Sequence, residues 1–162
     1  MTNTKTALPQ ATANPELAAG VAQLLTPVVQ DLIALSVNGK QAHWHVRGAN
    51  FIGIHELLDQ VVDNAREAYD TAAERIVALG LPVDGRLGSV ASETRTPALS
   101  EGFQNTTTVI TEMVAQIDAT LATVNRAITE LDDVDLVSQD VAIAIAQQLE
   151  KDRWFLFAHI AA

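Results

Sequence analysis

The sequence predicts an all-α protein, a four-helix bundle with a long connection between its second and third helices. Four long segments repeat apolar residues at intervals of three and four positions, the spacing of one buried helix face. Hydrophobic residues make up 48% of the 162 residues but aromatic residues only 4%, so small aliphatic side chains supply the core. No alternating strand pattern or hairpin signal competes with this interpretation. The length fits one domain with one core.

The N-terminal end of the chain predicts a mobile tail followed by the first helix. Residues 1–14 lack apolar periodicity, so the bundle domain is expected over residues 15–162. The segment Asn14-Pro15-Glu16 offers a capping side chain, a proline at the first helical position and an acid in the first turn. This helix is expected to run to about Val46. Pro27 is unfavourable within it, which predicts either a kink or a later start at Thr26-Pro27.

Three further helices follow, separated by segments that interrupt the apolar pattern. The second is expected from Phe51 to Leu79, the third from about Glu101 to Leu131, and the fourth from about Asp135 to Ile160 with Asp135 as its cap. The connection from Leu81 to Ser100 contains two prolines and two glycines and has room for one short helix. A crossover of this length joins two parallel helices at opposite ends of a bundle.

Composition excludes several classes of protein. The absence of cysteine excludes disulfides, iron–sulfur clusters and thiolate metal sites. No apolar run approaching the ~18–20 residues of a membrane span is evident, and the first residues do not resemble a signal peptide. We therefore expect a cytoplasmic protein with no membrane partner. Twenty acids against ten bases argue against a general DNA-binding surface and favour attraction of cations, although a solvated acidic surface is an equally ordinary reading.

The second helix carries two pairs of metal-ligating residues. His55 and Asp59 lie four residues apart, as do Asp70 and Glu74, so each pair shares one helix face. Asp59 and Asp70 are nevertheless separated by roughly 16 Å along the helix axis. The two pairs therefore cannot bind one metal ion within a single straight helix.

Two antiparallel copies of this helix bring the pairs together. His55 and Asp59 are separated by the same four-residue interval as Asp70 and Glu74. A two-fold axis near Asn64–Ala65 therefore sets His55 opposite Glu74 and Asp59 opposite Asp70 of the second copy. Such a contact creates two identical sites, each with ligands from both chains. Imidazole combined with carboxylate suits iron(II), and other divalent cations can use the same ligands. Either pair alone is more often a solvated helix face, but their coincidence with clustered histidines favours a metal site.

The residues at the end of the first helix extend this candidate site. His43 is close enough in sequence to join His55. His45 lies two residues further, points about 200° away on a helix and is assigned no metal role. Trp44 is a candidate radical trap beside the site, although an aromatic packed at a subunit contact is the commoner situation.

Three alternative interpretations compete with the intersubunit site. A metal site inside the bundle needs Glu-x-x-His motifs on two helices, and the sequence contains no such motif. A metal-dependent hydrolase could use the same histidines and carboxylates to activate water. A non-catalytic helical assembly could use the polar residues for hydrogen bonds between subunits.

The segment KQAHWHVRGANFIGIHELLD, followed by DTAAER, closely resembles the Dps family of miniferritins within the ferritin-like superfamily. The pattern is H-x11-H-x3-D-x10-D-x3-E, and the resemblance continues in LDDVDLVSQD and LEKDRWF near the C-terminus. By family analogy, His43, His55 and Asp59 come from one subunit. Asp70 and Glu74 come from its two-fold mate. These five residues are the predicted catalytic iron ligands.

The resemblance also implies a homo-oligomer, a hollow dodecamer that oxidises iron(II), usually with hydrogen peroxide, and stores the ferric product. It places Asp140 in a pore for iron uptake, whereas the simpler reading is an acid in the first helical turn. Members of the family that bind DNA often do so through a lysine-rich N-terminal tail, but residues 1–14 contain only Lys5. Direct DNA contact is therefore not expected, while protection by removal of iron and peroxide is.

Overall fold

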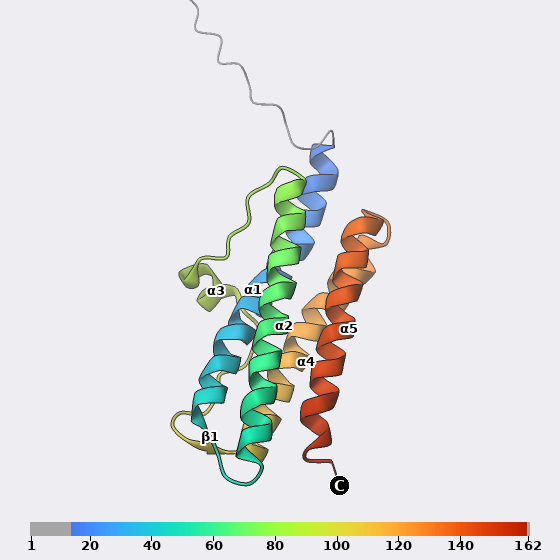
Figure 1. Cartoon of the computed structure of the whole chain (residues 1–162). Helices are drawn as coiled ribbons and strands as arrows, with labels where there is room; N and C mark the ends of the chain where they lie inside the picture. Colours follow the sequence, from blue (N-terminus) through green and yellow to red (C-terminus); the bar gives the residue numbers. More distant parts are fainter. Residues whose placement is uncertain (1–13, 162) are drawn as a thin grey trace, which may run out of the picture.

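The computed structural model describes residues 14–161, which form a bundle of four long helices lying side by side (Figure 1). The four helices are α1 Pro15–His45, α2 Phe51–Ala78, α4 Thr106–Leu131 and α5 Leu136–Ala158. A short helix, α3 Leu87–Glu93, lies in the long connection between α2 and α4 and contacts α1. The predicted fold class, including the crossover and its short helix, is thereby confirmed. The predicted tail, apart from Asn14, lies outside the described residues.

Helix α1 begins at its first predicted start and continues through Pro27. The side chain of Asn14 accepts a hydrogen bond from the backbone N–H of Leu17 at 3.0 Å and so caps the helix. The alternative start at Pro27 is wrong, because Val21 and Leu25 before the proline are fully buried in the core. Their packing stabilises the first turns in spite of the backbone hydrogen bond that proline cannot donate.

Helix α1 is also more apolar than expected from the sequence. Among the described helices it is the one long and apolar enough to cross a bilayer, so the expectation that no segment would be is wrong. However, 56% of its apolar window is buried inside the bundle. The apolar composition is explained by its position in the core, which α1 shares with α2 and α4.

A short pair of strands closes one end of the bundle and was not predicted. Strand β1 Val46–Arg47 follows α1 directly and pairs in parallel with β2 Gln104–Asn105. The third long helix therefore begins at Thr106 rather than Glu101. Gly102 adopts a positive φ of 74°, and the Asn105 side chain accepts a hydrogen bond from Thr108 N–H at 2.9 Å. Gly102, strand β2 and the Asn105 cap all lie between Glu101 and Thr106, which explains why the helix starts later than expected.

The other helix ends agree closely with the sequence. Helix α2 ends at Ala78 and is followed by Gly80 with a φ of 92°, as expected for a glycine that terminates a helix. Asp135 caps α5 by accepting a hydrogen bond from Ser138 N–H at 2.9 Å. The same carboxylate accepts a hydrogen bond from Arg75 of α2 at 2.7 Å, which ties two helices together.

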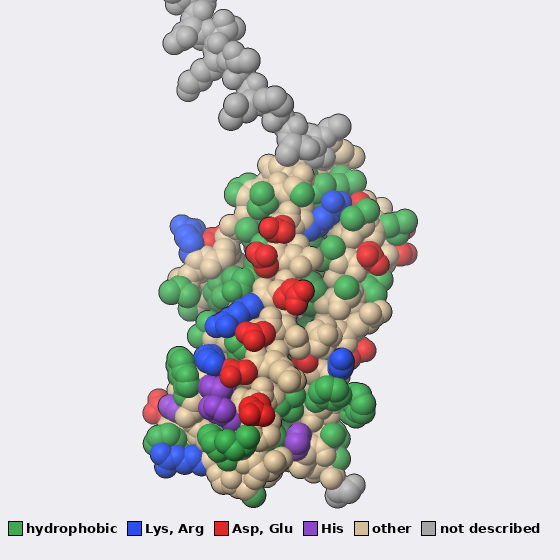
Figure 2. All heavy atoms as spheres, in the orientation of Figure 1, with side chains coloured by type: hydrophobic (Ala, Val, Ile, Leu, Met, Phe, Trp, Pro, Cys, Tyr) green, Lys and Arg blue, Asp and Glu red, His purple; other side chains and the backbone are tan. Residues whose placement is uncertain are grey.

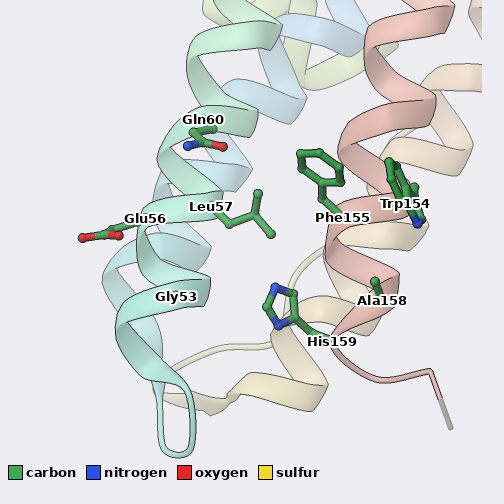
Figure 3. A pocket seen from close by; sticks show the side chains of 8 residues that line it. All are labelled: Gly53, Glu56, Leu57, Gln60, Trp154, Phe155, Ala158 and His159. Carbon is green, nitrogen blue, oxygen red and sulfur yellow. The ribbon is translucent and has the colours of Figure 1, made fainter.

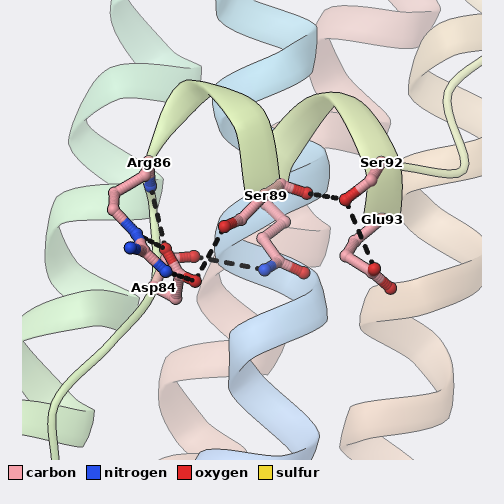
Figure 4. Close-up of polar contacts among 6 residues, drawn as sticks. Asp84, Arg86, Ser89, Ser92 and Glu93 are labelled. Carbon is pink, nitrogen blue, oxygen red and sulfur yellow. Dashed lines mark hydrogen bonds and ion pairs between the residues drawn. The ribbon is translucent and has the colours of Figure 1, made fainter.

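One aspartate fixes the crossover to the bundle, and a second stabilises the start of the short helix within the crossover. Asp31 of α1 is fully buried and accepts hydrogen bonds from the Thr94 hydroxyl, from Arg95 N–H and from the Thr123 hydroxyl, at 2.9, 2.8 and 2.6 Å. Asp84, just before α3, accepts hydrogen bonds from Arg86 and Ser89 (Figure 4). The hydrogen bond from Arg86 holds the pKa of Asp84 well below its usual range.

The hydrogen bonds to Asp31 lead to a prediction about stability. Asp31→Ala removes a buried acceptor and leaves three donors without it, one of them on buried Thr123, which should lower the free energy of unfolding by about 3 kcal/mol. We expect a melting temperature lower by roughly 5–10 °C, measured by circular dichroism in metal-free buffer. The matched control is Asp118→Ala, which removes an exposed ion pair with Arg153 and should have little effect. Equal losses in both variants would contradict this role for Asp31.

Candidate metal centre

Two stacked histidines form the centre of the candidate site. His43 lies in the last turn of α1 and is buried, and His55 lies in the second turn of α2 and is half-buried. Their ring centroids are 3.6 Å apart and their planes differ by 22°. The structure therefore brings together these two residues across the α1–α2 turn, as the sequence predicted.

Reciprocal hydrogen bonds orient both rings. His43 Nδ1 donates to the backbone carbonyl of His55 at 2.8 Å, and His55 Nδ1 donates to that of His43 at 3.0 Å. A carbonyl oxygen can only accept, so each Nδ1 must carry the proton. Each Nε2 is then the nitrogen with the free lone pair, which is the form that binds a metal ion. The backbone carbonyl of each histidine thus fixes the tautomer of the other histidine, with the proton on Nδ1 and the free lone pair on Nε2.

Close approach of α1 and α2 makes the stacking possible. Gly39 lies one turn before His43, and a Cβ atom at this position would come within 2.8 Å of Val62 Cγ2 on α2. Glycine therefore permits a helix contact that alanine would disturb. Beyond the histidines, the Arg47 guanidinium lies 3.1 Å from the centroid of the Phe103 ring and fastens the end of the bundle.

Asp59 lies beside the histidines but is occupied by a lysine of the same chain. Lys40 Nζ on α1 forms a short ion pair with Asp59 Oδ1, and His43 Nδ1 lies 3.2 Å from the same oxygen. The hydrogen bond from Lys40 lowers the pKa of Asp59, with a smaller contribution from His43. The carboxylate is therefore ionised at neutral pH, and a metal ion must compete with Lys40 for it.

Asp70 and Glu74 lie far from this cluster, further along α2. Both are exposed, and among the described residues neither carboxylate has a hydrogen bond or ion pair. Figure 2 shows acidic side chains distributed over α2, with the histidines near its lower end. Within residues 14–161 of one chain, no set of three histidine, cysteine or acidic side chains is arranged to hold a metal ion. A single subunit thus contains the predicted ligands in two separate groups.

The remaining candidates occupy separate positions. Trp44 is 62% exposed, and His45 packs against Phe103 with 5.3 Å between ring centroids. Asp140 is exposed and lies beyond the first turn of α5, in which no acid occurs, so the reading of Asp140 as a first-turn acid is wrong. His159 is the C-cap of α5, and its Nδ1 lies 3.0 Å from Asn50 Nδ2.

Two residues at the site were not identified from the sequence. Lys40 precedes His43 by three residues and therefore shares its helix face, a signal that could have indicated its proximity to Asp59. Gly39 within a long helix is a second signal, because an interior glycine that costs stability often marks a close backbone approach. Neither partner on α2 could be identified without the tertiary structure.

Comparison with known proteins agrees with this geometry. The ferritin-like domain family matches residues 22–162. The DNA protection during starvation (Dps) protein of Mycolicibacterium smegmatis is 34% identical over 143 residues, which cover 88% of this chain and 78% of that protein. The chain belongs to the Dps family. A Dps protein of Agrobacterium fabrum is 31% identical over 138 residues, 85% of each chain.

Solved Dps structures share the whole fold. Dps from Microbacterium arborescens, in its high iron form, is 58% identical and superposes with a TM-score of 0.91 over 93% of this chain and 99% of that one. A tetragonal crystal form of Mycobacterium smegmatis Dps is 33% identical, with a TM-score of 0.87 over 92% and 91% of the two chains. The Dps bundle therefore includes the α1–α2 turn that carries the stacked histidines.

The ion pair between Lys40 and Asp59 leads to a prediction about metal affinity. Lys40→Gln removes the competitor for Asp59 and should strengthen metal binding about three- to fivefold, the range for a partly exposed pair worth roughly 0.6–1 kcal/mol. Calorimetric titration of the assembled protein with Co(II), which resembles Fe(II) but is not oxidised by air, measures this. Arg126→Gln, at an exposed pair with Glu130 on α4, should leave the affinity unchanged. Weaker binding by Lys40→Gln would show that the lysine supports the site instead.

Proposed function

We propose that this protein oxidises Fe(II) at sites shared between two subunits and stores the ferric product inside a hollow dodecamer, with hydrogen peroxide as the oxidant. Membership of the Dps family supports iron storage and protection of DNA from oxidative damage. It also supports a homo-oligomer and an iron-binding role. The proposal assigns His43, His55 and Asp59 of one subunit, with Asp70 and Glu74 of the two-fold mate, as the ligands of the substrate iron.

The stacked histidines are the observation on which this proposal depends. Their hydrogen bonds leave both Nε2 atoms available as ligands, although one chain lacks enough further ligands around them. Asp70 and Glu74 are exposed and unpaired among the described residues, as expected for ligands that serve another subunit. An antiparallel α2–α2 contact would unite the two groups and place Asp59 opposite Asp70. Two facing carboxylates repel one another unless a cation lies between them.

The same two-fold axis pairs other exposed residues of α2 in a favourable way. It sets Ile52 opposite Val77, and these side chains are 59% and 54% exposed in the single chain. It also sets Asp63 opposite Arg66, which would give two reciprocal ion pairs beside the axis. Apolar residues at both ends of the contact and complementary charges at its centre are typical of an isologous interface. The axis proposed for the metal ligands thus also suits the rest of the helix face.

The chemistry of the proposed site fits a two-electron oxidation. Two Fe(II) ions each give one electron to hydrogen peroxide, whose O–O bond breaks to yield two hydroxide ions and no hydroxyl radical. Histidine nitrogens suit Fe(II), and the carboxylates favour the harder Fe(III) product. Trp44, on the helix that carries His43, is proposed as a trap for stray radicals, and Asp140 as part of an acidic pore that attracts Fe(II) to the assembly.

Mixed assemblies provide the decisive test of a shared site. Asp59→Asn and Glu74→Gln should each reduce the rate of Fe(II) oxidation by peroxide at least about tenfold in uniform assemblies, because every site loses a ligand. In a mixed dimer, one site receives both substitutions and the other receives neither. Refolding the two variants together should therefore recover activity, measured by the growth of ferric absorbance.

Two results would contradict the shared site. Mixed assemblies that form, as shown by mass spectrometry, but recover no activity would exclude ligands contributed by both subunits. Anomalous scattering from iron found only inside the four-helix core would also exclude it. Asp59→Asn subunits refolded in the same way without the second variant serve as the control, since no intact site can arise in their assemblies.

Protection of DNA is proposed to occur without direct contact. The chain has a net charge of −10 and one base, Lys5, among its first fourteen residues. Because DNA binding requires neutralisation of phosphates by basic side chains, we expect no stable complex. A gel-shift assay of the assembled protein at physiological salt, with divalent ions chelated, measures this. Tight binding would reveal a basic surface that forms only on assembly.

A further inference from the structure

A second buried polar cluster lies in the cleft between α2 and α5, away from the histidines. At the lower end of the two helices, Leu57 and Gln60 face Phe155 across this cleft (Figure 3). Gln60 and Phe155 also line the adjoining part, a cavity of about 300 Å³. Asp152 lies in its wall, and this residue is only 3% exposed.

Asp152 is an incompletely satisfied carboxylate. Its Oδ1 atom accepts hydrogen bonds from Asn64 Nδ2 at 2.8 Å and from Gln148 Nε2 at 3.0 Å. Its Oδ2 atom is buried and has no hydrogen-bond partner among the described residues. Burial raises the pKa of Asp152 to about 6. A buried carboxylate oxygen without a partner is costly, and a cation beside Oδ2 would supply the missing contact.

The charged side chains around the cavity do not supply that cation. Lys151 also lines the cavity, but its Nζ lies 5.6 Å from the centroid of the Phe155 ring and forms no ion pair with Asp152 among the described residues. Asp63, the other acid of the lining, is paired with Arg66 at 3.3 Å. Asp152 is therefore the carboxylate of this lining that has no ion pair among the described residues, and a cation in the cleft would compensate its charge.

The available donor atoms define the kind of cation. Because Asn64 and Gln148 use their amide nitrogens to bond Asp152, their amide oxygens remain free to act as ligands. Gln60 offers a further amide, and no histidine lines this cavity. Oxygen-only ligation suits hard divalent cations such as Mg(II), Mn(II) or Fe(II), which complete their coordination with water.

We propose that Asp152, with the amide oxygens of Asn64 and Gln148, forms a second cation site within each subunit, specific for hard divalent ions. It differs from the proposed oxidation site in having no nitrogen ligands and in requiring no partner subunit. Asn64 follows Asp59 by five residues, about 7.5 Å along the axis of α2. Five residues also turn the helix by roughly 140° beyond one full turn, so the two sites lie on different faces of α2, toward α5 and toward α1.

The test is an anomalous-scattering map of the assembled protein in crystals soaked with Mn(II). A peak within coordination distance of Asp152 Oδ2 is expected in the wild-type protein. The peak should be absent in Asp152→Asn, and Mn(II) binding in solution, measured by electron paramagnetic resonance, should fall by one ion per subunit. The neutral isostere should fold, since it keeps the shape of Asp152 and an oxygen that can accept the hydrogen bonds from Asn64 and Gln148.

Two further variants separate this proposal from the oxidation site. Asp59→Asn should keep the Mn(II) peak at Asp152, whereas Asp118→Asn, at an exposed ion pair on α4, should leave all sites unchanged. A wild-type map with Mn(II) only at the two-fold axis, or with Lys151 or a water molecule at Asp152 Oδ2, would overturn the proposal. The wild-type map decides this even if a variant is unstable, and neither result depends on whether the protein oxidises iron.

Discussion

The candidate metal site depends on the close contact between the end of α1 and the start of α2. Each histidine ring is held by the backbone carbonyl of the other helix, so the positions of His43 and His55 depend on the relative placement of the two helices. That placement requires Gly39, because a side chain there would meet Val62. The β1–β2 pair and the contact between Arg47 and Phe103 then fix the turn beyond the histidines. The close approach of α1 and α2 at a glycine is thus a condition for the geometry of the candidate metal site.

Charge is distributed so that the proposed ligands of one subunit are stable without metal. The Lys40 ammonium compensates Asp59, whereas Asp70 and Glu74 remain in solvent, where ionised carboxylates cost little. Asp152 is different, because it is buried and only one of its oxygens is satisfied. The same physical rule explains all three situations: a carboxylate is paired, hydrated or available for a cation.

Much of the fold could be predicted because it depends on local signals. The Asn14 and Asp135 caps, the glycine after α2 and the apolar spacing of the helices act within one or two turns of chain. The start of α4 has local signals as well, in Gly102 and the Asn105 cap. The strand before it does not, because β2 depends on the pairing of Gln104 with Val46, and the sequence around Gln104 contains no local sign of that partner. Similarly, the continuation of α1 through Pro27 follows from burial of the preceding turns rather than from helix propensity.

The candidate site shows the same division. The sequence by itself determined the ligand types and their spacing, because a helix of fixed pitch places residues four positions apart on one face. From this spacing followed the separation of the two pairs along α2 and the proposal that a second subunit unites them, and the nearness of His43 to His55 in sequence suggested that they meet. Only the tertiary structure decided that the Nδ1 atoms of His43 and His55 donate to backbone carbonyls and that Lys40 forms an ion pair with Asp59. It also decided that Asp152 is buried with one carboxylate oxygen that has no hydrogen-bond partner among the described residues. These features join residues that are 12, 19 and 88 positions apart in the chain. No local pattern specifies such contacts, since they arise only when the helices pack against one another.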